Sequence, residues 1–198
     1  IVLYGEAKQQ DDFLNVLQSL TLQNLISIRI VMPESWRPVV EESELQQNNM
    51  FYLEAATREK LYYQALAEAE TPYILFADSK VSYANNAFKY AMKNFIKSPA
   101  DFLIELIYHR NYGDIQAVLL DTALNSIKTG YQYNDRMAMD YTLTNKFFRT
   151  EFLKSRQFDK TKSLLSHLPQ LLCHGYYAFM NDGIVFYEDD EDTYMDYV

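Results

Sequence analysis

The stretch TPYILFADSKVSY, residues 71–83, decides the fold prediction. Its apolar run from Tyr73 to Ala77 predicts a buried strand, and that strand ends on an acid, Asp78. In α/β sheets, ligands bind beyond the carboxyl ends of the strands. We therefore expect Asp78 to lie at a functional site. Where a second acid would complete a cation site, the sequence has Lys80.

Strand and helix signals alternate along the first two-thirds of the chain. The first helix has its apolar residues close to a 3.6-residue period, and Thr57 is placed to cap the second. This alternation indicates βαβ crossovers, and therefore an α/β fold with a mostly parallel sheet sandwiched by helices. Strands are predicted over residues 1–5, 26–32, 49–55, 72–78 and 101–109, and helices over residues 11–25, 57–70 and 84–97.

The last third of the chain has a different character. Residues 135–159 are polar and aromatic with helical stretches. Residues 162–175 predict a helix that breaks or starts near Pro169. Residues 176–188 form two short strand-like runs around Asn-Asp-Gly, a composition typical of a tight β-hairpin.

Composition limits the domain count and the classes of function. We expect one domain over residues 1–188, followed by an acidic tail over residues 189–198 that would link to any further domain. The net charge of −9 argues against nonspecific binding to nucleic acid or anionic lipid. No apolar stretch approaches the roughly 20 residues that cross a bilayer. The single cysteine, Cys173, has apolar neighbours, so we expect a small core residue and a reducing, cytoplasmic environment.

Three segments carry a pattern in a fixed order: residues 1–35, 65–104 and 142–159. Together they resemble the inverting GT-A glycosyltransferases of family 2, which build bacterial capsules, teichoic acids and other surface polysaccharides. The resemblance covers nearly the whole chain. It implies a GT-A, Rossmann-like fold with a C-terminal helical segment and a small β-hairpin. In the first segment, the residues that keep the family's helix pattern are Phe13, Leu14, Leu17, Ser19, Leu20 and Gln23.

The resemblance places the metal site at the end of the strand that carries Asp78. In the family the matching acid lies near the donor's ribose, and a second acid holds the Mn²⁺ or Mg²⁺ that neutralises the leaving diphosphate. That second acid falls at Lys80 or Val81 here, so we expect no metal cofactor; Mn²⁺ or Mg²⁺ would be the ion if a site does form. Lys80 either replaces the metal's charge on the diphosphate or, as we prefer, faces solvent where the site has decayed.

The resemblance also locates a base and a nucleotide pocket. The family's acid pair falls at Ser166-His167, so His167 is the candidate base, with a hydrogen-bonded structural residue as the alternative. Candidates for nucleotide-sugar contact, besides Asp78 and Lys80, are Glu6, Glu34 and Arg58, each of which is also explained as an ordinary surface residue. Trp36 is a candidate for stacking on a ligand, with core packing as the alternative.

The resemblance implies a family-2-like domain of bacterial surface-polysaccharide or teichoic-acid biosynthesis. Because the metal and base positions depart from the family pattern, we expect a pseudoenzyme that serves as an accessory or binding domain. Two alternatives stay open: an active, metal-independent inverting transferase, and an interaction or oligomerisation module without nucleotide binding.

The implied partners differ among these functions. An active enzyme needs a nucleotide-sugar and a saccharide or polyol-phosphate acceptor, and an accessory domain needs a fused or partner polymerase. A homo-oligomer is compatible with each. A partner or another domain would hold the protein at the inner face of the membrane if it acts there.

Overall fold

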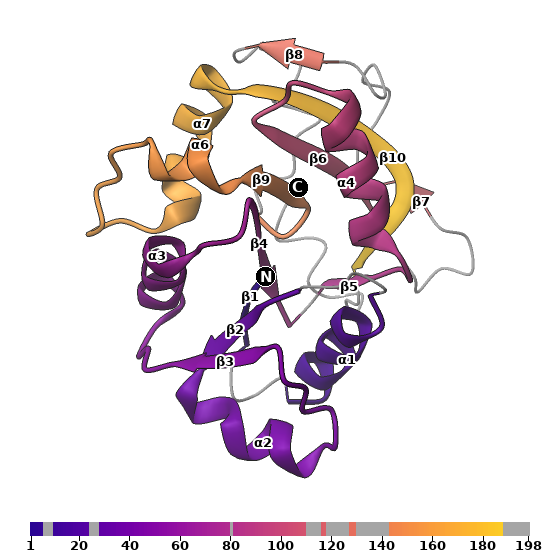
Figure 1. The fold of residues 1–198 in the computed structure, drawn as a ribbon, viewed down its shortest axis with the longest axis vertical. Coiled ribbons are helices and arrows are strands. Elements are labelled where there is room, and N and C mark those ends of the chain that lie inside the picture. Colours follow the sequence, from indigo (N-terminus) through magenta and orange to yellow (C-terminus); the bar gives the residue numbers. More distant parts are fainter. Residues whose placement is uncertain are drawn as a thin grey trace.

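The computed structural model describes residues 1–5, 10–23, 28–79, 81–109, 116–117, 127–129 and 143–187. The described strands form one mixed sheet in the order β3-β2-β1-β4-β9-β6-β10-β5, with β7 on β6 and β8 on β10 (Figure 1). The strands are β1 (Val2–Tyr4), β2 (Ile30–Pro33), β3 (Met50–Leu53), β4 (Tyr73–Asp78), β5 (Val81–Tyr83), β6 (Phe102–His109), β7 (Gln116–Ala117), β8 (Ile127–Thr129), β9 (Lys146–Arg149) and β10 (Tyr176–Tyr187).

The helices lie on both faces of this sheet (Figure 1). One core joins α1 and α4 to one face, and a second core joins α3, α6 and α7 to the other. The helices are α1 (Gln10–Thr21), α2 (Arg37–Glu42), α3 (Arg58–Glu68), α4 (Ala87–Lys97), α6 (Thr150–Lys154) and α7 (Leu168–His174), with two 3₁₀ turns, η2 (Glu34–Trp36) and η3 (Leu164–His167).

Strand β4 shows why the opening stretch decides the fold. Its side chains alternate between the two cores: Ile74 and Phe76 enter the α3 side, and Leu75 and Ala77 enter the α1 side. A strand buried on both faces needs a continuous apolar run, which is what residues 73–77 supply. The predicted α/β fold is confirmed, and helix α3 begins after Thr57, whose side chain accepts a hydrogen bond from the Lys60 amide as predicted.

The predicted mostly parallel sheet is confirmed, and its second half adds antiparallel pairings. Strands β3, β2, β1 and β4 are parallel to one another, but β9 lies antiparallel between β4 and β6. Residues 146–149 were expected to belong to a polar-aromatic, partly helical segment. They form a central strand because Phe147 and Phe148 face opposite cores, which only the sheet environment provides.

The predicted hairpin at residues 176–188 is wrong. Strand β10 runs continuously through Asn-Asp-Gly and pairs in parallel with β6 on both sides of a register shift between Met180 and Val185. The turn-forming residues therefore make a bulge, because β6 is available as a partner for both runs. Cys173 is also not a core residue: it is exposed on α7. The helix start near Pro169 is confirmed, since Pro169 lies in the first turn of α7.

Two polar residues of the family-like helix pattern attach α1 to the sheet. The Ser19 hydroxyl donates to the Val16 carbonyl at 2.7 Å and accepts from the Tyr83 amide at 3.2 Å. Gln23 is buried, and its side-chain amide donates to the Ser19 and Ala84 carbonyls at 2.8 and 3.0 Å. Its oxygen accepts from the Phe88 amide at 3.3 Å. Ser19 and Gln23, the two polar residues of the family-like pattern, therefore hold α1 against β5 and the start of α4.

We expect Gln23→Leu to lower the free energy of unfolding by about 1–3 kcal/mol, because it leaves buried backbone groups at the start of α4 without partners. Urea unfolding followed by circular dichroism measures this change. Gln18→Leu, at an exposed position of α1, is the matched control and should change stability by about 0.5 kcal/mol or less. Equal effects of the two substitutions would contradict the assigned role of Gln23.

Candidate functional site

The candidate site lies where strands β1 and β4 end. Tyr4 of β1 is paired in register with Asp78 of β4, so the last residues of the two parallel strands stand side by side. Asp78 is half-buried at this edge. The predicted position of Asp78, at the carboxyl edge of the sheet, is confirmed.

Arg58 and Asp78 come together around Tyr62. Arg58 begins α3, and its guanidinium carbon lies 5.4 Å from the centroid of the Tyr4 ring. The Tyr62 hydroxyl donates a long hydrogen bond, 3.4 Å, to the Ala77 carbonyl. Burial raises the pKa of Tyr62 well above its usual range, the charge of Asp78 raises it further, and the charge of Arg58 opposes both. The charges of Asp78 and Arg58 therefore act in opposite directions on the pKa of one buried tyrosine, Tyr62.

A second buried phenol lies on the other face of the sheet edge. The Tyr83 hydroxyl donates to the Thr144 carbonyl at 2.7 Å. Burial raises the pKa of Tyr83, and the charge of Asp78 adds to the effect. Because Tyr62 and Tyr83 belong to different cores, Asp78 stands at the edge between the two. From the sequence, Tyr62 and Tyr83 are candidates for stacking on a sugar or a base, with core packing preferred, and both are buried in the core.

Glu34 follows β2 but is directed to other partners. Its carboxylate oxygens lie 2.9 and 3.0 Å from Nε and Nη2 of Arg37, a bidentate pair that is about half exposed. The Arg37 guanidinium in turn lies 4.8 Å from the ring centroid of Tyr52 on β3. The structure therefore places Glu34 in a separate group with Arg37 and Tyr52, neither of which was predicted as a partner from the sequence.

Glu6 and Lys80 lie outside the described residues. Within the described parts of the chain, no group of three or more histidine, cysteine, aspartate or glutamate side chains is arranged to hold a metal ion. The described portion likewise has no helix that combines the length and apolarity needed to cross a membrane.

His167 occupies a packed position on the α3 side of the molecule. Its Nε2–H donates to the Asp159 carbonyl at 3.1 Å, and its ring centroid lies 5.2 Å from that of Phe158. The same loop is attached to α3, because the Tyr63 hydroxyl donates to the Lys162 carbonyl at 3.0 Å. With Nε2 occupied, a role as a base would fall to Nδ1.

Trp36 belongs to the core. It is buried, and its ring centroid lies 3.8 Å from that of Phe13. A Cβ atom at Gly5, just after β1, would lie 2.9 Å from the Trp36 ring, so only glycine allows this approach. Of the two interpretations of Trp36, core packing is therefore confirmed.

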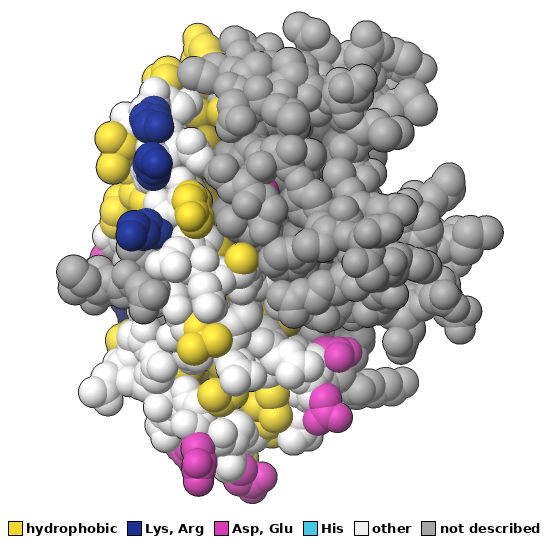
Figure 2. Space-filling model, turned by 90° about the vertical axis from the view of Figure 1, so that its right-hand side faces the viewer, with side chains coloured by type: hydrophobic (Ala, Val, Ile, Leu, Met, Phe, Trp, Pro, Cys, Tyr) yellow, Lys and Arg dark blue, Asp and Glu magenta, His cyan; other side chains and the backbone are white. Residues whose placement is uncertain are grey.

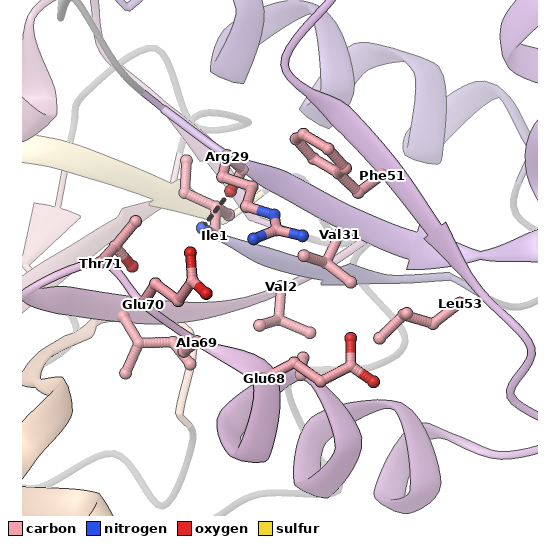
Figure 3. Close-up of a pocket in the computed structure, with 12 residues that line it drawn as sticks. Ile1, Val2, Arg29, Val31, Phe51, Leu53, Glu68, Ala69, Glu70 and Thr71 are labelled. Atoms are coloured by element: carbon pink, nitrogen blue, oxygen red, sulfur yellow. Dashed lines mark hydrogen bonds between the residues drawn. The ribbon is translucent and has the colours of Figure 1, made fainter.

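Two cavities lie at the opposite edge of the sheet, where its parallel strands begin. Figure 3 shows one at the amino end of β4, where the Ile1 nitrogen donates to the Arg29 carbonyl at 2.6 Å. A second cavity of about 290 Å³ adjoins it and is mainly apolar. Neither includes the site around Asp78. The second is lined by residues that include Ile28, Tyr73, Phe88, Met92 and Phe147.

Comparison with known proteins gives structural matches only. No protein-family model matches the chain, and no curated protein matches it in sequence. Residues 1–349 of Staphylococcus aureus TarS are 19% identical at a TM-score of 0.68, over 98% of this chain and 61% of that one. The same fragment in complex with UDP-GlcNAc is 18% identical at a TM-score of 0.71, over 100% of this chain and 60% of that one. HddC from Yersinia pseudotuberculosis is 10% identical at a TM-score of 0.63, over 99% of this chain and 96% of that one.

These similarities establish the fold and not the activity. The chain spans about three-fifths of the length of the TarS fragment. TarS is a glycosyltransferase with a GT-A fold, and the superposition covers essentially all of this chain. The chain therefore has the GT-A glycosyltransferase fold, as the sequence predicted.

Proposed function

We propose that this is a family-2-like domain of bacterial surface-polysaccharide or teichoic-acid biosynthesis that binds a nucleotide-sugar without metal-dependent transfer. The observation that carries the proposal is that the Arg58 guanidinium lies near the Tyr4 ring, and Tyr4 is paired with Asp78 at the carboxyl ends of β1 and β4. It is supported by the fold shared with TarS, which has been crystallised with UDP and with UDP-GlcNAc.

The charges at this edge suit a nucleoside diphosphate. Arg58 lies in the first turn of α3, where the helix dipole favours an anion and a guanidinium binds phosphate oxygens. The Asp78 carboxylate is an acceptor for sugar hydroxyl groups. Lys80, two residues further along the chain, brings a second cation to a position where a metal-binding acid would be needed. We therefore adopt here the other interpretation of Lys80, in which its charge, together with that of Arg58, replaces the charge that a divalent ion supplies elsewhere.

The proposed role is that of an accessory or binding domain. Transfer requires a base that deprotonates the acceptor hydroxyl. His167 has the residue type for this task, but its Nε2 is held by a backbone carbonyl in a packed loop. We therefore expect donor binding without turnover, in a chain whose partner domain carries out the polymer chemistry.

Thermal unfolding with UDP, UDP-GlcNAc, GDP and CDP, each with Mn²⁺ and with EDTA, tests this function. At a hundredfold excess over Kd, we expect a uridine nucleotide to raise Tm by about 5–10 °C equally in both conditions. Arg58→Ala and Lys80→Ala should each remove most of this shift. Lys60→Ala, at an exposed position of the same helix, should not.

The outcomes separate the three functions. A shift that requires Mn²⁺ would contradict metal-independent binding, and no shift with any nucleotide would favour the interaction module. Release of UDP from UDP-GlcNAc in the presence of an acceptor, abolished by His167→Ala, would instead identify an active metal-independent transferase.

A further inference from the structure

Helix α4 presents a basic outer face on an acidic protein. Its buried residues are Ala87, Phe88, Ala91 and Phe95, and they attach it to the sheet. The opposite side is exposed, and its five residues are Lys89, Tyr90, Lys93, Ile96 and Lys97. We call these five residues the α4 face. Figure 2 views the side of the molecule that carries α4 and shows Lys and Arg side chains in a row beside hydrophobic ones.

The lysines of the α4 face are regularly spaced. They recur every four residues, which corresponds to about 6 Å along the helix axis for each step. No acid occurs between Ala87 and Lys97, so the row carries three positive charges in a chain whose net charge is −9. The acids visible on this side of the molecule gather mainly at the lower end of the view (Figure 2).

Two apolar side chains border this row. Ile96 is 85% exposed and Tyr90 is 46% exposed, the former more than any other large hydrophobic residue described as exposed. On a helix they flank the lysines on either side, because Ile96 and Tyr90 fall about 120° apart with Lys93 between them. An exposed isoleucine surrounded by lysines is poorly suited to water, where its apolar surface stays hydrated.

We propose that the α4 face docks the domain on an anionic lipid surface. Lysines bind lipid phosphates, while an aliphatic and a tyrosine side chain enter the boundary between headgroups and acyl chains. One partner therefore satisfies both kinds of side chain on this face, which a soluble polyanion does not. The net negative charge of the chain opposes this only weakly, because charges more than about 10 Å from the membrane are screened at physiological salt.

The helix is firmly held, so it is a rigid platform and not an inserting peptide. Its C-terminal end is bound by Arg149, which donates to the carbonyls of Phe95 and Ser98 at 3.2 and 3.3 Å. Its N-terminal end is bound by Gln23 through the Phe88 amide. Docking through this face fixes the orientation of the domain relative to the membrane.

Co-sedimentation with phosphatidylcholine vesicles, with and without added phosphatidylglycerol, tests the proposal at low and at physiological salt. We expect binding only to the anionic vesicles, weakened by salt. Replacing Lys89, Lys93 and Lys97 by Gln should lower the partition coefficient about 100-fold, at ~1 kcal/mol per lysine. The matched control replaces three exposed lysines elsewhere, Lys60, Lys160 and Lys162, by Gln and should retain most of the binding.

Ile96→Ser separates a lipid surface from a soluble partner. This substitution leaves the charge unchanged and should lower vesicle binding about fivefold, because the isoleucine no longer enters the lipid boundary. Several results would overturn the proposal: equal binding to neutral vesicles, equal loss in the control variant, no effect of Ile96→Ser, or lysine-dependent binding of soluble polyphosphate without vesicle binding. The thermal shift with nucleotides should be the same in the lysine variant, so failure of lipid docking is distinguishable from failure of nucleotide binding.

Discussion

Phe102→Ala should lower the free energy of unfolding by about 3–5 kcal/mol, the largest change we expect from a single core substitution. Phe102 is fully buried at the start of β6. Its ring centroid lies 5.2 Å from that of Phe148, 5.8 Å from that of Phe152 and 5.4 Å from that of Tyr177. The substitution therefore opens a cavity where β6, β9, α6 and β10 meet. Urea unfolding measures the loss.

The control for this prediction is Phe51→Ala on the edge strand β3, where the ring is 40% exposed. We expect a change of about 1 kcal/mol or less at that position. If Phe102→Ala does not fold, Phe102→Leu should still fold with a loss of about 1–2 kcal/mol, because it retains most of the volume. Similar losses of stability for Phe102→Ala and Phe51→Ala would show that the aromatic cluster around Phe102 does not contribute more to stability than an exposed edge residue does.

The elements with local signals could be predicted from the sequence. Strand β4 has a continuous apolar run, helices α1 and α4 have an apolar period, and α3 has a capping residue. Strand β9 could not, because its four residues become a strand only by pairing with β4 and β6, about 74 and 44 positions away. The Asn-Asp-Gly segment favours a hairpin in isolation and becomes a bulge because β6 lies beside it.

The candidate site was predictable to a similar extent. The position of Asp78 follows from the strand that precedes it, whereas the proximity of Arg58 to Tyr4 depends on how α3 crosses the sheet. The bidentate pair between Glu34 and Arg37 depends on the 3₁₀ turn η2, which the sequence did not reveal. Side chains from separate elements meet only when the crossovers are fixed, and no local pattern encodes those crossovers.

The residues that resemble the family have structural tasks in this chain. Ser19 and Gln23 attach α1 to the sheet, and Arg149, within the third family-like segment, attaches β9 to α4. The departures from the family pattern fall at Lys80 and His167, where the resemblance implies chemistry. A scaffold that keeps its packing residues and changes its chemical ones fits a binding domain better than a metal-dependent transferase.

Arg149→Met should lower the free energy of unfolding by about 2–4 kcal/mol, because charged donors satisfy three carbonyls at one point of the fold. Its Nε donates to the Ala100 carbonyl at 2.8 Å, and Nη2 donates to the carbonyls of Phe95 and Ser98. The guanidinium also lies 5.0 Å from the ring centroid of Phe95. Thermal and urea unfolding measure the loss, and the α4 face would lose its rigid support with it.

Two further variants establish whether geometry or charge is responsible. Arg149→Lys keeps the positive charge near the C-terminus of α4, but a single ammonium group cannot donate to all three carbonyls that the guanidinium binds. It should therefore restore less than half of the stability lost in Arg149→Met. Arg156→Met, which removes one hydrogen bond of 3.3 Å to the His174 carbonyl, should cost about 1 kcal/mol or less. Full recovery with Arg149→Lys would mean that charge at the helix end, and not the three-carbonyl geometry, holds β9 to α4.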